Sequence, residues 1–381
     1  MVSNYRTTVV SEIDNLDKYL DDWNSLIDRT LEDNAYLTPD FLIPALRYNR
    51  SSTPFYVVFV YETSGARDLL VGVGAFSVIK PSLRIPCQMI STAVTRHAYL
   101  ASPLVDKEHA AKAIETLWQW MEDRNQSWRI INIQKLHNES RTWQLMESVF
   151  RKRGRSICKT VMYERPILRR YASFDDYLKK LPRKRRQEYG RLSRKLDKAG
   201  EVEICLLLET AEPIDLANRF MELERKSWKG TRGSALIKEQ DDTLFFREIM
   251  SNFTESGKIF MVELKLNNEI IAMSCNFIMG KTLFAFKVAY DPEYREYSPG
   301  IIAEYEGVRL FHENTELESA DSGTGGSSYI RNYWMDRAEI INNYVAMPGY
   351  LAVGCLNYLK LGIRAKNTLN SFIENIFSKS R

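Results

Sequence analysis

The 381-residue sequence has few of the residues that build metal sites and disulfide frameworks. Its five cysteines form no C-x-x-C motif and lie apart from the four scattered histidines. We therefore expect a reducing compartment and no structural metal. The residues concerned are Cys87, Cys158, Cys205, Cys275 and Cys355, with His97, His109, His137 and His312.

Long apolar runs and a strong charge of one sign are also missing. No run approaches the ~18 apolar residues of a membrane span, and Met1 to Arg6 lacks the apolar core of a secretory signal. We therefore expect a cytoplasmic protein. A net charge of +4 is too mild to indicate nucleic-acid binding by itself. What remains, 44% apolar and 27% charged residues in 381, is typical of a globular protein with two domains.

One stretch of the second half predicts a strand, a short turn and a helix. Residues 283–290 are apolar and rich in β-formers, and they end at Asp291-Pro292. Ser298 is the expected N-cap of a helix that starts at Pro299. The unpaired amides of such a first turn bind anions, and Gly300 would let a phosphate approach the backbone. A strand, turn and helix with a glycine also fit a purely structural role.

The chain as a whole predicts one order of elements twice: helix, helix, three strands, helix, strand, helix, strand. In the first half these elements are residues 15–30, a helix after Pro39, and 55–61, 69–79, 83–95, 106–124, 128–134, 139–153 and 157–164. We interpret this as a duplicated α/β unit with domains 1–168 and 169–381, a chance match of coarse patterns being the alternative. Tyr99 to Leu104, after the third strand of the first half, contains no glycine. The cofactor is therefore expected in the second half only.

The spacing Arg295-x-x-Ser298-x-Gly300 resembles the Arg/Gln-x-x-Gly-x-Gly/Ala pyrophosphate loop of the GNAT acyltransferase superfamily, with serine in place of the first glycine. The second half is similar to the GNAT branch found with bacterial exopolysaccharide and cellulose biosynthesis, a relative of the Fem-type aminoacyltransferases. The similarity rests on the basic helix 181–200, Glu224 to Gly230, Ala289 to Gly300, and Asp321-x-Gly323 followed by Tyr329. The first half is similar through 34–41 and 100–104.

This resemblance implies an α/β fold of two tandem GNAT-like domains, each a mixed central sheet flanked by helices. It also implies acyl-CoA as the co-substrate, without a metal. The residues that would contact the donor are Val288, Tyr290, Arg295, Ser298, Pro299, Gly300 and Ile301.

The catalytic residues expected on the same basis are Asp321, as the base or to orient the acceptor, and Tyr329, as the acid for the departing thiolate. Asp321 at a strand end also fits a simple turn cap. Trp228, Lys229 and Arg331 are expected at the acceptor, although an aromatic residue such as Trp228 is more often part of a core. Relatives tend to have a lysine directly after the tyrosine, where this chain has Ile330.

Two segments leave their partners open. Residues 183–198 carry eight basic side chains on a predicted helix, which is typical of a solvated face or of a site for a polyanion: an acidic glycan, a lipid phosphate or tRNA. In the last helix, Leu351, Cys355, Tyr358 and Leu359 have core-like spacing. The cluster 372–377 fits packing on the domain, a homodimer contact or a peripheral membrane contact.

The sequence therefore predicts an acyl-CoA-dependent N-acyltransferase that modifies an amino group of a sugar, a glycan precursor or another envelope-related small molecule. Two alternatives remain open. One is a Fem-like transferase that uses aminoacyl-tRNA, which the mild net charge disfavours. The other is a binding module on a GNAT frame without turnover, which the departures at Ser298 and Ile330 suggest.

Overall fold

The computed structural model describes residues 4–49, 53–64, 67–82, 86–92, 94–123, 127–227, 235–325 and 328–378, with side chains described up to residue 365. The first half contains both strands and helices. Its elements are β1 (Tyr5–Val10), 3-10 helix η1 (Ile13–Tyr19), α1 (Leu20–Ile27), η2 (Ala35–Leu37), α2 (Pro39–Tyr48), β2 (Phe55–Glu62), β3 (Leu69–Ile79), β4 (Gln88–Ser91), β5 (Leu104–Val105), α3 (Ala110–Asp123), β6 (Trp128–His137), α4 (Arg141–Lys152) and β7 (Ile157–Arg169).

The second half begins with two helices and then repeats the order of the first. Its elements are α5 (Phe174–Lys180), α6 (Arg183–Asp197), β8 (Val202–Leu207), α7 (Pro213–Lys226), η3 (Leu236–Lys238), α9 (Gln240–Glu255), β9 (Ile259–Leu266), β10 (Glu269–Met279), β11 (Thr282–Tyr290), η4 (Pro292–Tyr297), α10 (Pro299–Glu313), β12 (Ser319–Asp321), η5 (Tyr329–Asn332), β13 (Asp336–Ala346) and α11 (Tyr350–Ser378).

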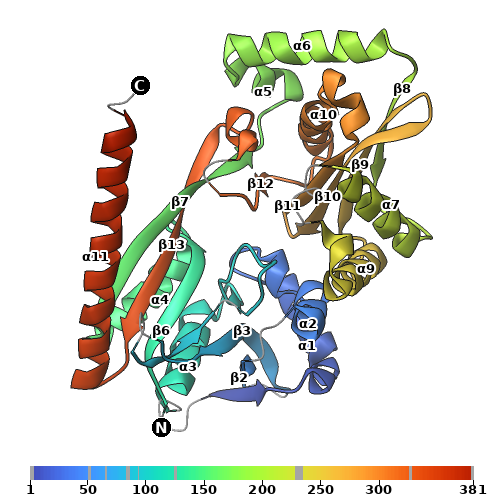
Figure 1. The fold of residues 1–381 in the computed structure, drawn as a ribbon. Coiled ribbons are helices and arrows are strands. Elements are labelled where there is room, and N and C mark those ends of the chain that lie inside the picture. Colours follow the sequence, from blue (N-terminus) through green and yellow to red (C-terminus); the bar gives the residue numbers. More distant parts are fainter. Residues whose placement is uncertain are drawn as a thin grey trace.

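A single 13-stranded sheet runs through both halves (Figure 1). Its strand order is β1-β2-β3-β4-β6-β13-β7-β12-β11-β10-β9-β8, with β5 paired to β3 beside this path. The expectation of an α/β fold with a mixed sheet and flanking helices is confirmed. Two edge strands, β1 and β8, were missed by the sequence reading. Both are only half-buried, so their apolar pattern is weak.

The two halves are joined by an exchange of strands. Strand β13, from the end of the chain, lies between β6 and β7 and pairs antiparallel with both. Strand β7 in turn reaches the second half, where residues 167–169 pair with β12. The predicted boundary at residue 168 therefore falls inside β7, and each half is completed by a strand of the other.

Apolar contacts also cross between the halves. Helix α2 packs against α9, where Phe41 meets Phe245 edge to face at 5.5 Å between ring centroids. Both rings belong to one core cluster that contains residues of both halves. Because this cluster is shared, we expect the halves to unfold together.

The last helix, α11, lies along β6 and β13. Leu359 is buried as its spacing predicts, whereas Leu351 and Tyr358 are 74% and 49% exposed and were wrongly assigned to a core face. The side chains of residues 372–377 lie outside the described part of the chain. Among the described residues, no helix combines the length and apolar composition needed to cross a membrane.

Candidate functional site

The second half opens where β11 and β12 diverge. These strands are parallel and pair only over 282–284 and 319–321, after which β12 ends while β11 continues to Tyr290. The pairing of β11 with β10 shifts by one residue opposite Cys275 and Asn276, which is a β-bulge. The divergence and the bulge both loosen the sheet at this point. Helix α10 covers this region against β9, β10 and β11.

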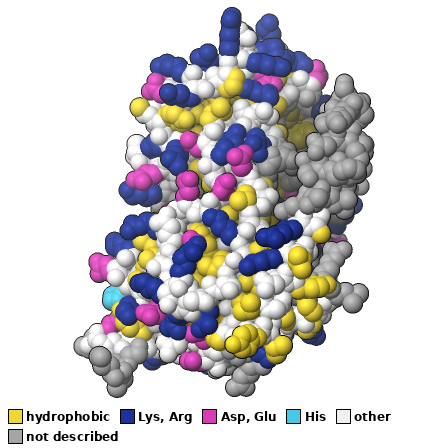
Figure 2. Space-filling view, turned by 90° about the vertical axis from the view of Figure 1, so that its left-hand side faces the viewer, with side chains coloured by type: hydrophobic (Ala, Val, Ile, Leu, Met, Phe, Trp, Pro, Cys, Tyr) yellow, Lys and Arg dark blue, Asp and Glu magenta, His cyan; other side chains and the backbone are white. Residues whose placement is uncertain are grey.

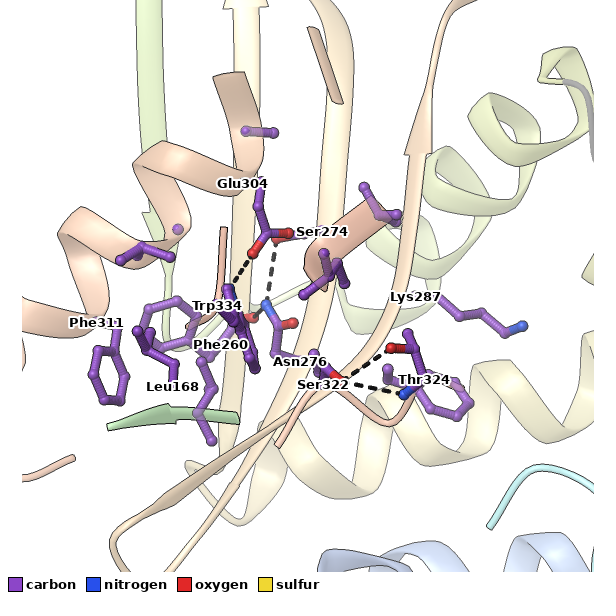
Figure 3. Close-up of a pocket in the computed structure, with 18 residues that line it drawn as sticks. Leu168, Phe260, Ser274, Asn276, Lys287, Glu304, Phe311, Ser322, Thr324 and Trp334 are labelled. Carbon is purple, nitrogen blue, oxygen red and sulfur yellow. Dashed lines mark hydrogen bonds between the residues drawn. The ribbon is translucent and has the colours of Figure 1, made fainter. Parts of the chain in front are cut away.

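A cavity of about 80 Å³ lies in this opening, and Figure 3 shows the side chains around it. Its wall is apolar at Leu168, Phe260 and Phe311, and its polar groups come from β10, β11, α10 and the loop after β12. Such a mixture of an apolar wall with a few polar groups is typical of a ligand site. The polar or charged lining residues are Ser274, Asn276, Lys287, Glu304, Ser322 and Thr324.

In the first half, helix α3 lines a cavity of only about 10 Å³, together with residues of β3 and α4. The lining positions of the two helices have identical spacing. Ile114, Leu117, Trp118 and Met121 of α3 correspond to Glu304, Gly307, Val308 and Phe311 of α10. Leucine and tryptophan therefore fill the first half where glycine and valine leave room in the second. A Cβ atom added at Gly307 would meet nothing within 4 Å.

Glu304 is a residue of this site that the sequence reading missed. Its carboxylate accepts a hydrogen bond of 2.6 Å from Trp334 Nε1. Burial raises the pKa of Glu304 to about 7, from an ordinary value of 4.5. A signal was present in the sequence, because Glu304 lies on the same face of α10 as the buried Val308 and Phe311.

The first turn of α10 differs from its prediction. Ser298 occupies the N-cap position, but its backbone is left-handed (φ 54°, ψ 51°) and its side chain makes no capping hydrogen bond. This conformation costs a serine roughly 1–2 kcal/mol, which explains why a glycine would suit the position. The amides of Ile301 and Ile302 donate to the Ser298 carbonyl, and the Ser298 amide donates to Arg295. Some of the amide groups expected to bind an anion therefore already have acceptors within the protein.

Gly300 has a packing reason in addition to the predicted one. An added Cβ would lie 3.3 Å from the ring of Tyr290, so the aromatic ring covers the glycine. Of the other predicted donor residues, Val288 lines the cavity and Pro299 is buried. Arg295 is exposed on η4. Of the predicted donor residues, all within the described part of the chain, Val288 alone is in the cavity lining, and the contact of all of them with a donor stays a prediction.

Asp321 is fully engaged by its neighbours. Both of its carboxylate oxygens lie 3.2 Å from Arg165 Nη1, and it also contacts His137 Nε2 at 2.8 Å and the Gly323 amide at 2.7 Å. Arg165 and His137 hold the pKa of Asp321 well below its usual range despite its burial. So low a pKa disfavours the role of base and favours that of a positioning residue. Arg165 is fully buried and His137 comes from the first half.

Tyr329 begins η5 and is 39% exposed, and its pKa is raised by desolvation and by the charge of Glu304. It therefore lies within electrostatic reach of the cavity carboxylate. Arg331 donates to Glu164 of β7 at 3.0 Å, so its charge is already paired. Ile330 lines the cavity. Trp228 and Lys229 lie outside the described residues.

A second polar cluster lies on the opposite face of β11. His97 of the first half contacts Asp242 of α9, with Nε2 to Oδ1 at 3.0 Å, and stacks on Phe245 with ring centroids 5.1 Å apart. Burial lowers the pKa of His97, and the nearby charge of Lys287 adds to this. Figure 3 shows Lys287 pointing away from the cavity. Groups of both halves thus flank β11 at its bulge.

Comparison with known proteins agrees with this geometry. Residues 183–331 match the acetyltransferase (GNAT) domain family. The crystal structure of FemX is similar over 90% of this chain and 97% of its own, with a TM-score of 0.59 and 12% identity. The C-terminal domain (DUF2156) of a putative lysylphosphatidylglycerol synthetase from Agrobacterium fabrum is similar over 91% of this chain and 96% of its own, with a TM-score of 0.53 and 11% identity.

A conserved protein of unknown function from Bacteroides thetaiotaomicron is similar over 86% of this chain and 97% of its own, with a TM-score of 0.53 and 12% identity. No curated protein matches the sequence. At these identities the similar structures show the fold alone. The chain therefore has a tandem GNAT-like fold, and its residues 183–331 match a GNAT acetyltransferase domain.

Proposed function

We propose that this protein is an N-acyltransferase that takes an acyl group from acyl-CoA and transfers it to an amino group of a sugar, a glycan precursor or another envelope-related small molecule. The observation that carries the proposal is the contrast between the two halves. The opening between β11 and β12 has a cavity of about 80 Å³ under α10, whereas the cavity that α3 lines in the first half measures only about 10 Å³. The sugar or glycan acceptor rests on the resemblance alone.

The arrangement suits a thioester donor whose phosphates lie at η4 and the start of α10. Arg295 is exposed there, and the helix N-terminus carries partial positive charge. A pantetheine chain would then run along β11 past Val288 into the cavity. A volume of about 80 Å³ is several times the roughly 10–15 Å³ that a cavity needs to hold one water, which leaves room for a short acyl group.

The chemistry requires two proton transfers. The amine nitrogen forms a bond to the acyl carbon and loses a proton, while the bond from that carbon to sulfur breaks and the thiolate gains a proton. Glu304, with a pKa of about 7, is suited to accept the first proton near neutral pH. Tyr329 keeps its proton at neutral pH because its pKa is raised, and it is the proposed donor of the second proton to a sulfur held close to it. Asp321 would hold β12 against His137 and Arg165 of the first half.

Calorimetry with acetyl-CoA and longer acyl-CoAs tests the donor, and free-thiol release in the presence of amino sugars tests turnover. Absence of binding by every acyl-CoA at millimolar ligand would refute the donor. Binding without thiol release for any amine would instead favour a module without catalysis.

A Fem-like reaction with aminoacyl-tRNA is the second candidate, and the exposed basic residues of α6 favour it. RNA binding that neutralises phosphates weakens steeply with salt. Filter binding of bulk tRNA at low and moderate salt distinguishes the two donors. Retention of tRNA together with no affinity for acyl-CoA would favour this second candidate.

A further inference from the structure

The basic helix α6 lies beside the turn at which the donor phosphates are proposed to bind. It runs along α10, since Tyr189 donates to Glu306 Oε1 at 2.8 Å and Tyr305 donates to the Arg185 carbonyl at 2.8 Å. Farther along α6, Lys195 donates to the carbonyl of Glu296 in η4 at 2.9 Å. The C-terminal half of α6 therefore lies at the N-terminal end of α10.

Most of the cations on α6 have no acidic partner. Arg185 pairs with Glu188, and Lys195 pairs with Glu296. The other six basic side chains are exposed and form no ion pair with another described residue. These are Arg183, Lys184, Arg186, Arg191, Arg194 and Lys198. Figure 2 shows Lys and Arg side chains gathered at the top of the molecule, which is where α6 lies in Figure 1.

Three of these cations belong to the end near η4. Arg191 and Lys198 flank Lys195 at spacings of four and three residues, so all three share one side of the helix. Arg194 is adjacent, and Arg295 is exposed on η4 itself. Solvated like charges repel one another, so a cluster of this kind gains stability when an anion binds.

We propose that Arg191, Arg194 and Lys198 of α6, together with Arg295, form a subsite for the phosphate on the ribose of the donor nucleotide, the 3′-phosphate of CoA. This inference rests on the proposed function. A CoA molecule whose pyrophosphate lies at the start of α10 places its ribose phosphate outside the cavity, on the solvent side of η4. Acidic neighbours compensate this charge only in part. Glu296 is paired with Lys195 and Asp291 with Lys226, which leaves the exposed Asp197 and Glu293 against the four exposed cations.

Calorimetry with two commercial ligands that differ only in this phosphate, CoA and 3′-dephospho-CoA, tests the subsite. In the unchanged protein we expect CoA to bind at least 10-fold more tightly. In the double variant Arg191→Gln with Lys198→Gln, the two ligands should bind within about twofold of each other, because the partners of the extra phosphate are lost. The affinity for 3′-dephospho-CoA itself should change little.

A matched control removes the same charge from the other end of the same helix. In Arg183→Gln with Arg186→Gln, the preference for CoA should remain. Loss of the preference for CoA in this control would overturn the subsite, because it would show that the preference arises from the total positive charge of α6 and not from the residues near η4. Equal binding of CoA and 3′-dephospho-CoA by the unchanged protein would also overturn it, while leaving the proposed function intact.

Two further outcomes concern the donor itself. Absence of binding by both ligands would refute the proposed function together with the subsite. If bulk tRNA displaces CoA, and if both double variants lose tRNA affinity equally, the whole basic face of α6 binds nucleic acid. That result would overturn the subsite.

Discussion

Substituting leucine for Gly307 should close the cavity between β11 and β12 without destabilising the protein. The first half shows the expected result, because Leu117 occupies the matching position of α3 and the cavity there measures about 10 Å³ instead of about 80 Å³. No atom lies within 4 Å of the place where a Cβ at Gly307 would stand, so the new side chain starts in open space.

The stability change can be estimated from two contributions of the same sign. Replacing a glycine in the middle of a helix contributes about 1 kcal/mol, and burying a leucine side chain contributes about 1.5–3 kcal/mol. Incomplete fit in the cavity will offset part of this gain. For a chain of this length, each kcal/mol shifts Tm by about 1 °C. We therefore expect Gly307→Leu to melt at or slightly above the temperature of the unchanged protein.

Binding should respond in the opposite direction. Isothermal titration with acetyl-CoA should show at least a 100-fold loss of affinity in Gly307→Leu, since the side chain occupies the space proposed for the acyl group. Gly307→Ala should retain affinity within a few fold and gain up to about 1 kcal/mol in stability. Gly354→Leu, an exposed glycine of α11 with no neighbour at its Cβ position, is the matched control and should bind normally. Unchanged acetyl-CoA affinity in a cooperatively melting Gly307→Leu protein would refute the placement of the donor.

Substitutions at Glu304, at the Asp321 and Arg165 pair and at Ser298 test the electrostatics and the strain of the site. Because the pKa of Glu304 is raised from 4.5 to about 7, its ionisation destabilises the folded state as pH rises through that window. Urea unfolding at pH 8 should therefore show Glu304→Gln to be more stable than the unchanged protein by up to about 3 kcal/mol. At pH 4.5 the two proteins should differ little. A difference that is the same at both pH values would contradict the raised pKa. Asp321→Asn should cost about 3–5 kcal/mol because it leaves Arg165 buried without its partner, and the double change Asp321→Leu with Arg165→Met should recover most of this loss. An Asp321→Asn protein that is as stable as the unchanged protein would contradict a structural role for the Asp321 and Arg165 pair. Ser298→Gly should raise stability by up to about 1 kcal/mol by removing the left-handed serine, and Ser298→Val should lower it by at least as much; equal melting of both variants would contradict the strain.

The sequence by itself determined the elements whose signals are local. Asn267 and Asn268 tolerate positive φ, and both adopt it in the turn between β9 and β10. Asp291-Pro292 ends β11, and Pro299 begins α10, as their backbone preferences predict. The periodicity of apolar residues located most helices, and the repeated element order predicted the duplicated unit. These features depend on neighbours a few residues apart, which a pattern records.

Only the tertiary structure decided the features that depend on distant residues. The insertion of β13 between β6 and β7 follows from the pairing of strands about 180 residues apart, and no local pattern encodes that partner. The pKa values of Asp321 and Glu304 move in opposite directions because Arg165 reaches the first and apolar packing surrounds the second. The cavity likewise depends on which side chains α3 and α10 direct at the diverging strands, since a glycine leaves room only where nothing else fills it.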